Sequence, residues 1–157
     1  MRLLDLFCGA GGTSMGYHRA GFEVVGVDIN PQKNYPFEFH QADALTFPLE
    51  GFDVIHASPP CQKWSKASNI HVGKVYQDYL TPMRERLNKT TGVWIIENVI
   101  HAPLGHAIRL CGLMFDLKVF RHRDFECSHL LFKPAHPTHK GKRIGEGYFS
   151  IAGGAGR

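Results

Sequence analysis

Short apolar runs alternate with helix-compatible stretches along this chain, and this alternation limits the fold more than any other feature. The expected strands are Arg2–Phe7, Phe22–Val27, Phe37–Gln41, Phe52–Ala57 and Val93–Ile96. Helices are expected over Thr13–Ala20 and about Val75–Asn88. Such alternation is typical of βαβ units. We therefore predict an α/β fold with a doubly wound, mostly parallel sheet, whose ligands bind at the carboxyl ends of the strands.

Length and composition fit a globular protein. The chain has 157 residues, of which 43% are hydrophobic and 20% charged, which suits one domain. No apolar run approaches the roughly 18–20 residues that a membrane span needs, and no secretion signal is visible. We therefore expect a cytoplasmic protein with no membrane partner. The net charge is +4, and seven lysines and arginines against two acids lie between Lys118 and Arg143. This bias is compatible with a polyanionic partner or with ordinary solvated surface.

A glycine-rich turn follows the first expected strand. Gly9, Gly11 and Gly12 would let the backbone approach a ligand at the start of the next helix. The spacing lacks the third glycine of a dinucleotide-binding turn. Asp28 ends the second strand, where a carboxylate can hydrogen-bond a ribose. A nucleoside without a pyrophosphate fits both features, and a tight turn with an incidental acid is the alternative.

Two further strands end in residues that can do chemistry. Ser58-Pro-Pro-Cys-Gln62 follows the fourth strand, and the two prolines stiffen the turn that presents Cys61. A thiol in that place is a candidate nucleophile. Glu97-Asn-Val99 ends the fifth strand and would project a carboxyl group into the same cleft. Taken alone, the cysteine could be a small buried residue and the glutamate a helix cap.

Together these segments resemble the cytosine-C5 DNA methyltransferases. The ordered set is Asp5-Leu-Phe-Cys-Gly-Ala-Gly-Gly12, Asp28, Asp43, Ser58-Pro-Pro-Cys-Gln62 and Glu97-Asn-Val99, and the resemblance covers about Leu3 to Glu126. Arg121 and Arg123 take the arginine places of a Gln-x-Arg-x-Arg motif, with Val119 in place of the glutamine. The region from Glu97 to Glu126 looks most like small phage-type members.

The resemblance implies methyl transfer from S-adenosylmethionine to C5 of a cytosine flipped out of duplex DNA. It implies that Cys61 attacks C6, that Glu97 holds the N3/N4 edge, and that Arg121 and Arg123 stabilise the thiolate, the nucleotide and its phosphates. It also implies that residues 62–73 form a mobile loop over the base.

The same resemblance implies a cofactor site. The matching positions are Phe7, Gly9, Gly11, Asp28, Asp43 and Pro60. Asp28 would take the ribose, Asp43 the adenine amino group, and Pro60 a wall of the pocket. Phe7, Gly9 and Gly11 would surround the methionine and adenosine portions.

The chain departs from the family after Cys127. We expect residues 1–127 to form a catalytic and cofactor-binding domain and residues 128–157 to form a Pro/His/Gly-rich loop or tail. Neither a target-recognition domain nor the family's final Asn-Ser-Val-like segment is found. We expect a fragment or a chain completed by a second chain. RNA methylation and a silent cofactor- or nucleic-acid-binding fragment remain alternatives, and a thiol-dependent hydrolase is a more distant one.

The tail also contains potential metal ligands. Cys127, His129, His136 and His139 lie within thirteen residues, and zinc could accept such a set. The spacing matches no standard zinc finger, so we assign no metal site from the sequence. Cys8 and Cys111 are predicted to be small apolar packing residues.

Overall fold

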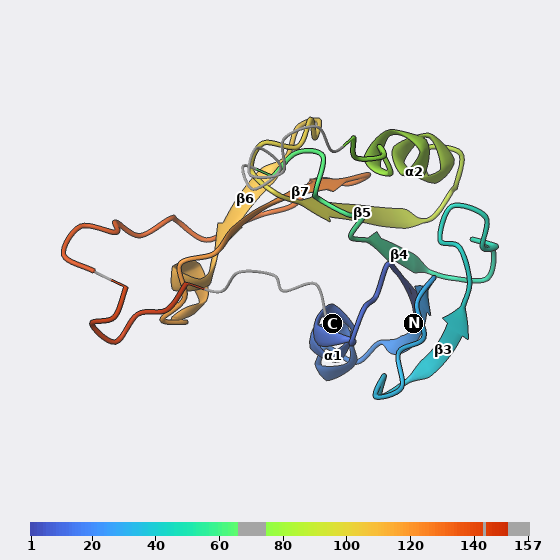
Figure 1. The fold of residues 1–157 in the computed structure, drawn as a ribbon, viewed down its shortest axis with the longest axis horizontal. Coiled ribbons are helices and arrows are strands. Elements are labelled where there is room, and N and C mark those ends of the chain that lie inside the picture. Colours follow the sequence, from blue (N-terminus) through green and yellow to red (C-terminus); the bar gives the residue numbers. More distant parts are fainter. Residues whose placement is uncertain (66–74, 143, 151–157) are drawn as a thin grey trace.

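The computed structural model describes residues 1–65, 75–142 and 144–150. In this part of the chain one sheet holds seven strands in the order β3-β2-β1-β4-β5-β7-β6 (Figure 1). Their bounds are β1 Arg2–Leu6, β2 Glu23–Asp28, β3 Glu38–Gln41, β4 Val54–Ala57, β5 Val93–Asn98, β6 Ile108–Cys111 and β7 His122–Cys127. β1 to β5 pair with one another in parallel, and β7 is antiparallel to both β5 and β6.

The strand order reverses beside β1. β1 pairs with β2 on one side and with β4 on the other, in register from Leu3 to Leu6 along both. This is the topological switch point at which ligands of open α/β sheets bind. The prediction of a doubly wound, mostly parallel α/β sheet is confirmed.

The first helix has the predicted length and begins one residue early, whereas the second helix is shorter than the sequence pattern predicts. α1 spans Gly12–Arg19 and α2 spans Leu80–Leu87, with a short 3₁₀ helix η2 over Gly112–Phe115. The expected helix over Val75–Asn88 begins late because the Asp78 carboxylate accepts the backbone N–H groups of Leu80 and Thr81, at 3.0 and 3.1 Å. A side-chain acceptor at this place fixes the first turn.

β6 and β7 were not predicted from the sequence. Their residues are too polar for an apolar run, since β7 reads His-Arg-Asp-Phe-Glu-Cys and stands half-buried near an edge of the sheet. A cross-strand ion pair supports the hairpin: Arg109 and Asp124 lie opposite each other, with Nε 2.7 Å from Oδ1.

The core covers both faces of the sheet. One cluster is built on Leu4, Leu6, Ile55 and Ile96 and receives α2 through Met83. The opposite face packs Leu3, Val24 and Val54 against side chains that include Tyr17 and Phe22. Because strand residues alternate in direction, Leu3 and Leu4 serve different faces.

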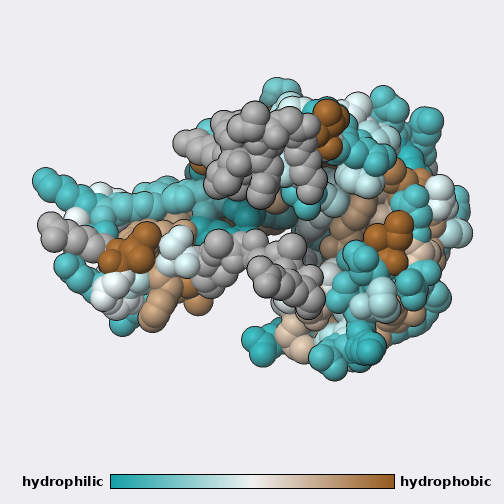
Figure 2. All heavy atoms as spheres, viewed as in Figure 1, coloured by the Kyte–Doolittle hydropathy of each residue, from teal (hydrophilic) through white to brown (hydrophobic). Residues whose placement is uncertain are grey.

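Apolar side chains on the outside are scattered among hydrophilic ones (Figure 2). Within the described ranges, none of the helices is long and apolar enough to traverse a lipid bilayer. The segment after β7 runs back along the β6–β7 hairpin toward η2 (Figure 1).

Candidate functional site

The loop that carries Cys61 and the strand that carries Glu97 are fixed to each other. β4 and β5 are parallel neighbours with Ala57 opposite Ile96, so their carboxyl ends meet. Asn98 is buried at that end, and its Nδ2 donates to the Pro59 carbonyl oxygen at 2.9 Å. Its Oδ1 accepts the Val99 backbone N–H at 2.9 Å. The Asn98 amide therefore holds the loop before Cys61 against the end of β5.

Two arginines approach the same place from the start of β7. Arg123 Nε lies 2.7 Å from Glu97 Oε1, and both side chains are about four-fifths buried. Arg121 interacts electrostatically with Glu97 and Cys61. Burial and the neighbouring Arg123 lower the pKa of Arg121, whereas Glu97 and Cys61 act in the opposite direction. The structure thus gathers all four residues predicted to be catalytic.

The environment of Glu97 shifts the pKa of its carboxyl group upward. Burial raises the pKa of this carboxyl, and Arg123, Arg121 and a hydrogen bond from Ser58 oppose the rise. A carboxyl group that is easily protonated can donate a hydrogen bond as well as accept one. Glu97 can therefore hold or release a proton at a ring nitrogen.

A buried hydrogen-bond chain reaches Glu97 from α1. Tyr17 Oη lies 3.0 Å from His56 Nδ1, and His56 Nε2 lies 2.8 Å from Ser58 Oγ, which bonds to Glu97. Burial lowers the pKa of His56 to about 4, so its ring is neutral and has one N–H. When Glu97 is ionised, Ser58 must donate to it. His56 Nε2–H then donates to Ser58, and Tyr17 donates to Nδ1.

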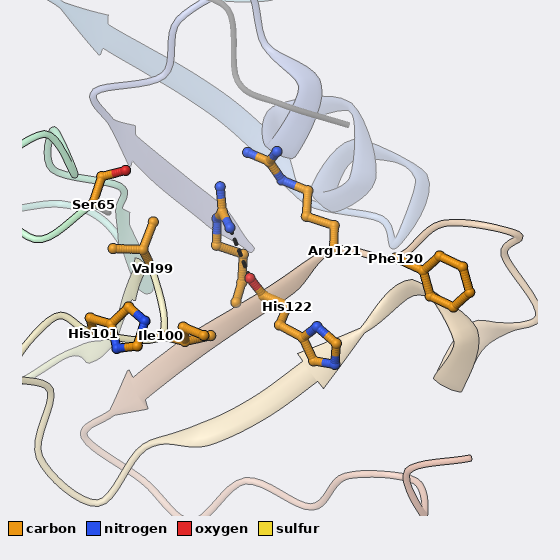
Figure 3. Close-up of a pocket in the computed structure, with 8 residues that line it drawn as sticks. Ser65, Val99, Ile100, His101, Phe120, Arg121 and His122 are labelled. Carbon is orange, nitrogen blue, oxygen red and sulfur yellow. Dashed lines mark hydrogen bonds between the residues drawn. The ribbon is translucent and has the colours of Figure 1, made fainter. Parts of the chain in front are cut away.

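The arginines separate two cavities. One has a volume of about 460 Å³ and lies at the carboxyl ends of the central strands, where its wall includes Asp5, Phe7, Ser58, Glu97, Arg121 and Arg123. The other has a volume of about 290 Å³ and is lined by Ser65, Val99, Ile100, His101, Phe120, Arg121, His122 and Arg123 (Figure 3). The side chain of Arg121 points away from the ring of His122 (Figure 3). Arg123 is fixed by a bond from Nη1 to the His122 carbonyl at 2.8 Å.

The glycine-rich turn is folded onto the predicted ribose-binding acid. Gly9 N–H donates to Asp28 Oδ2 at 3.0 Å, and Asn30 N–H donates to Oδ1 at 2.9 Å. Phe7 and Gly11 have φ of 60° and 86°, and the value at Phe7 is unusual for a residue with a side chain. A Cβ on Gly11 would lie 3.0 Å from the Tyr35 ring. The backbone here is held in an uncommon shape, as is frequent at functional sites.

Asp43 lies at the same edge of the sheet as Asp28. Ala42 N–H donates to the Asp28 carbonyl oxygen at 3.0 Å, which joins the ends of β2 and β3. The Asp43 side chain is exposed and accepts the Leu45 N–H at 2.8 Å, so it also stabilises a turn. Pro60 is half-buried beside the Cys61 turn. The roles assigned to these residues stay predictions.

The potential metal ligands gather differently from the sequence prediction. The four that come together are Cys111, His122, His136 and His139, so Cys127 and His129 are replaced by residues of the β6–β7 hairpin. The prediction for Cys8 as a buried packing residue holds, with 8% exposure. Cys111 is also buried, but its Sγ lies 3.6 Å from His139 Nε2, so packing is not its only contact.

Comparison with known protein families identifies the family to which the chain belongs. The model of the C-5 cytosine-specific DNA methylase family matches residues 1–101, which is more than half of the chain. The chain belongs to this family. The match includes the Cys61 loop and Glu97, and the resemblance noted in the sequence is confirmed.

Several bacterial methyltransferases are similar to this methylase-family chain. Type II methyltransferase M.FnuDI of Fusobacterium nucleatum is 32% identical over 54% of the chain and 29% of its own length. M.HgiDI of Herpetosiphon aurantiacus is 31% identical over 74% of the chain and 43% of its own length. M.HgiGI of the same organism is 29% identical over 66% of the chain and 94% of its own length. The chain thus spans less than half the length of the first two relatives.

A solved structure has the same fold as this family member. The Dnmt2 methyltransferase of S. pombe superposes with a TM-score of 0.57 over 87% of the chain and 53% of the Dnmt2 chain, at 18% identity. At this identity the likeness supports the fold alone.

The sequence analysis did not predict the roles of three polar residues of the site. Asn98 lies inside a motif that was noted, but only its partner Pro59 reveals its role. His56 and Ser58 give a signal, because a polar pair ends an otherwise apolar strand. Most of the predicted mobile loop over residues 62–73 lies outside the described residues, as does the tail from residue 151.

Proposed function

We propose that this chain carries the chemistry of an S-adenosylmethionine-dependent DNA cytosine-C5 methyltransferase with Cys61 as the nucleophile. The observation that carries the proposal is the convergence at one sheet edge. Asn98 fixes the Cys61 loop to β5, and Arg123 and Arg121 bring positive charge to Glu97 and Cys61. A nucleophile, a proton-holding carboxyl and two cations are the groups that this reaction needs.

The residues present fit S-adenosylmethionine as the methyl donor. When bound, it supplies an electrophilic methyl group. Asp28 uses its carboxylate to bind Gly9 and Asn30, yet a carboxylate has about four acceptor positions, so it can accept ribose hydroxyls as well. The Asp5 Oδ1 atom is buried on the wall of the 460 Å³ cavity and has no hydrogen-bond partner among the described residues. A donor group on a bound ligand would satisfy this atom.

The first chemical step is the addition of the Cys61 thiolate to C6 of the cytosine. The C6–S bond forms, the electrons of the C5=C6 bond move into the ring, and N3 takes a proton from Glu97. The flipped base is needed because C6 is stacked in the duplex. Arg121 interacts favourably with the thiolate before the attack. Arg123 keeps the Glu97 carboxyl oriented through its 2.7 Å ion pair.

The second step restores the enzyme. C5 now carries the electron pair and would take the methyl group that S-adenosylmethionine supplies, so that the donor would leave as S-adenosylhomocysteine. N3 returns its proton to Glu97. The C5 proton then leaves to solvent, the C5=C6 bond re-forms, and the C6–S bond breaks to give back the Cys61 thiolate. Glu97 ends as it began, which agrees with a pKa raised from its usual range.

We infer that DNA is the substrate and that a second chain contributes to its recognition. The basic stretch between Lys118 and Arg143 contains Arg121 and Arg123, so positive charge continues outward from the catalytic groups. The proposal gives the chemistry to this chain and part of the target recognition to a second chain.

Mapping of 5-methylcytosine in DNA from a methylation-deficient host tests the proposal. We expect methylation with the wild-type chain and none with Cys61→Ala, while Cys127→Ala serves as the matched cysteine control. A purified DNA containing 5-fluorocytosine should trap the Cys61 adduct, because fluorine cannot leave C5 as a proton does. Methylation of RNA but not DNA would overturn the substrate assignment. Failure of folded, cofactor-bound protein on both, with or without host extract, would overturn the activity.

A further inference from the structure

Four metal-ligating side chains converge at the outer end of the β6–β7 hairpin, beside the cavity of Figure 3. Cys111 ends β6 and His122 begins β7, and the two lie directly opposite each other in the ladder. His136 and His139 come from the segment that runs back along the hairpin. One ligand atom from each of the four lies within 4.8 Å of all the others.

Two of the ligand pairs are spaced much as the ligands of one tetrahedral ion are. Cys111 Sγ lies 3.6 Å from His139 Nε2, and His122 Nε2 lies 3.1 Å from His136 Nε2. With Zn–N near 2.0–2.1 Å and Zn–S near 2.3 Å, tetrahedral ligand atoms lie about 3.3–3.8 Å apart. The other pairs lie within 4.8 Å, so small rotations of the imidazole rings would place all four atoms around one ion.

The cluster is anchored on a buried thiol and opens toward the surface. Cys111 is 1% exposed, so a thiolate here would need a cation close by. His122 and His139 are half-buried, His136 is exposed, and the three imidazole rings have centroids 5.0–5.2 Å apart. The Phe120 ring packs on His139 and stacks on Tyr148, which covers one side of the cluster.

We propose that Cys111, His122, His136 and His139 bind one structural Zn²⁺ ion. Four nitrogen and sulfur ligands in a closed tetrahedral set are the donors that zinc prefers when it stabilises a fold. The ion would fasten the segment after β7 to the hairpin. Because His122 stands between Arg121 and Arg123 and its carbonyl oxygen accepts from Arg123, the same ion would fix the start of β7 beside Glu97.

The metal content of the purified full-length chain tests this inference. The protein is prepared without a polyhistidine tag, desalted, and analysed by mass spectrometry for zinc. We expect one zinc per chain, and at least a tenfold loss in the His136→Gln/His139→Gln double variant. Both histidines lie in the outer segment, so this variant should still fold. The control is Cys127→Ser/His129→Gln, which removes one cysteine and one histidine that lie outside the cluster and should keep the zinc.

Cobalt substitution identifies the ligands. Co²⁺ in the wild-type chain should show the visible absorption of a tetrahedral site with a thiolate charge-transfer band, and Cys111→Ser should lose that band. The Cys61→Ala variant should bind zinc like the wild type, so metal binding and methyl transfer can fail independently. Zinc that desalting removes, zinc retained by the His136/His139 variant, or zinc lost from the Cys127/His129 control would each overturn the site.

Discussion

Asp5 and His56 lie opposite each other on β1 and β4, and burial shifts their pKa values in opposite directions. Burial raises the pKa of Asp5 to about 6 and lowers the pKa of His56 to about 4. The folded protein therefore favours both groups in their neutral forms. Asp5 is held by Ser14, whose hydroxyl donates to its Oδ2, and His56 is held by Tyr17 and Ser58.

These two groups predict opposing pH dependences of stability. Between about pH 4 and 6 the folded state binds the Asp5 proton more tightly than the unfolded state, so this contribution falls as pH rises. Between about pH 4 and 6.5 the unfolded state protonates His56 and the folded state does not, so that contribution grows as pH rises. Each corresponds to roughly 3 kcal/mol over its window. The two should largely cancel in the wild type.

Substitution of Asp5 or His56 should reveal the pH dependence of stability that the remaining group causes. Urea unfolding at several pH values is expected to show stability rising with pH between 4 and 6.5 in Asp5→Asn. His56→Asn should show stability falling over pH 4 to 6. Parallel curves for the two variants would contradict the assignment, and Asp53→Asn is the control for an exposed acid.

Ser58 predicts a shift in the pH profile of the proposed reaction. Its hydroxyl bond lowers the pKa of Glu97 against the larger effect of burial. Ser58→Ala removes the bond, so the Glu97 pKa should rise further. If protonated Glu97 is the active form, the alkaline limb of the methyl-transfer rate moves to higher pH. Ser58→Thr keeps the hydroxyl and should restore the profile, and an unchanged profile in Ser58→Ala would exclude the role.

At the scale of the elements, Glu126 joins α2 and the loop after β5 to β7. Its carboxylate accepts from Arg84 Nη2 and the Gly105 N–H, at 2.7 and 2.8 Å. The Arg84 and Glu126 side chains are 23% and 11% exposed, whereas those of Arg109 and Asp124 are 50% and 13% exposed. The two carboxylates are therefore about equally shielded from water, but Arg84 is more shielded than Arg109.

This difference predicts unequal costs for two arginine substitutions. Arg84→Ala leaves the Glu126 charge poorly compensated in a buried place and should lower the free energy of unfolding by roughly 3 kcal/mol. Arg109→Ala removes a half-exposed arginine whose place beside Asp124 water can take, and should cost about 0.2–1 kcal/mol. Denaturant unfolding of the two variants measures both values. Equal losses would show that burial does not decide the strength of these pairs.

For the molecule as a whole, the sequence predicts most of the parallel half of the sheet and little of the other half. β1, β2 and β4 are apolar runs that end in glycine, acid or proline, so their limits are visible. β6 and β7 stay hidden because Arg109, Arg123 and Asp124 satisfy their charges across the hairpin and toward Glu97. The catalytic set is recognisable from motifs, whereas Asn98, His56 and the partners of Cys111 depend on contacts between segments far apart in the chain.

The switch point beside β1 separates the strands that carry Asp28 and Asp43, two of the predicted cofactor residues, from the strands that carry the predicted catalytic residues. Asp28 and Asp43 lie on β2 and after β3, whereas Cys61 follows β4, Glu97 lies on β5, and the two arginines lie just before and on β7. Ligand binding and chemistry should therefore be separable by mutation. Arg123→Ala is expected to slow methyl transfer at least tenfold while leaving the affinity for S-adenosylmethionine unchanged.

Asp28→Ala should show the reverse pattern in calorimetric titration with S-adenosylhomocysteine. Loss of the carboxylate removes the proposed acceptor for ribose and the bond from the Gly9 N–H, so affinity should fall at least tenfold. Asp53→Ala is the matched control, because its carboxylate accepts from Arg2 N–H at the amino end of the sheet. A lower affinity in Asp28→Ala than in Asp53→Ala would place the ligand at the carboxyl ends of the strands. Equal affinities in the two variants would place the ligand away from the end of β2, and the cofactor residues would have to be sought along the 460 Å³ cavity instead.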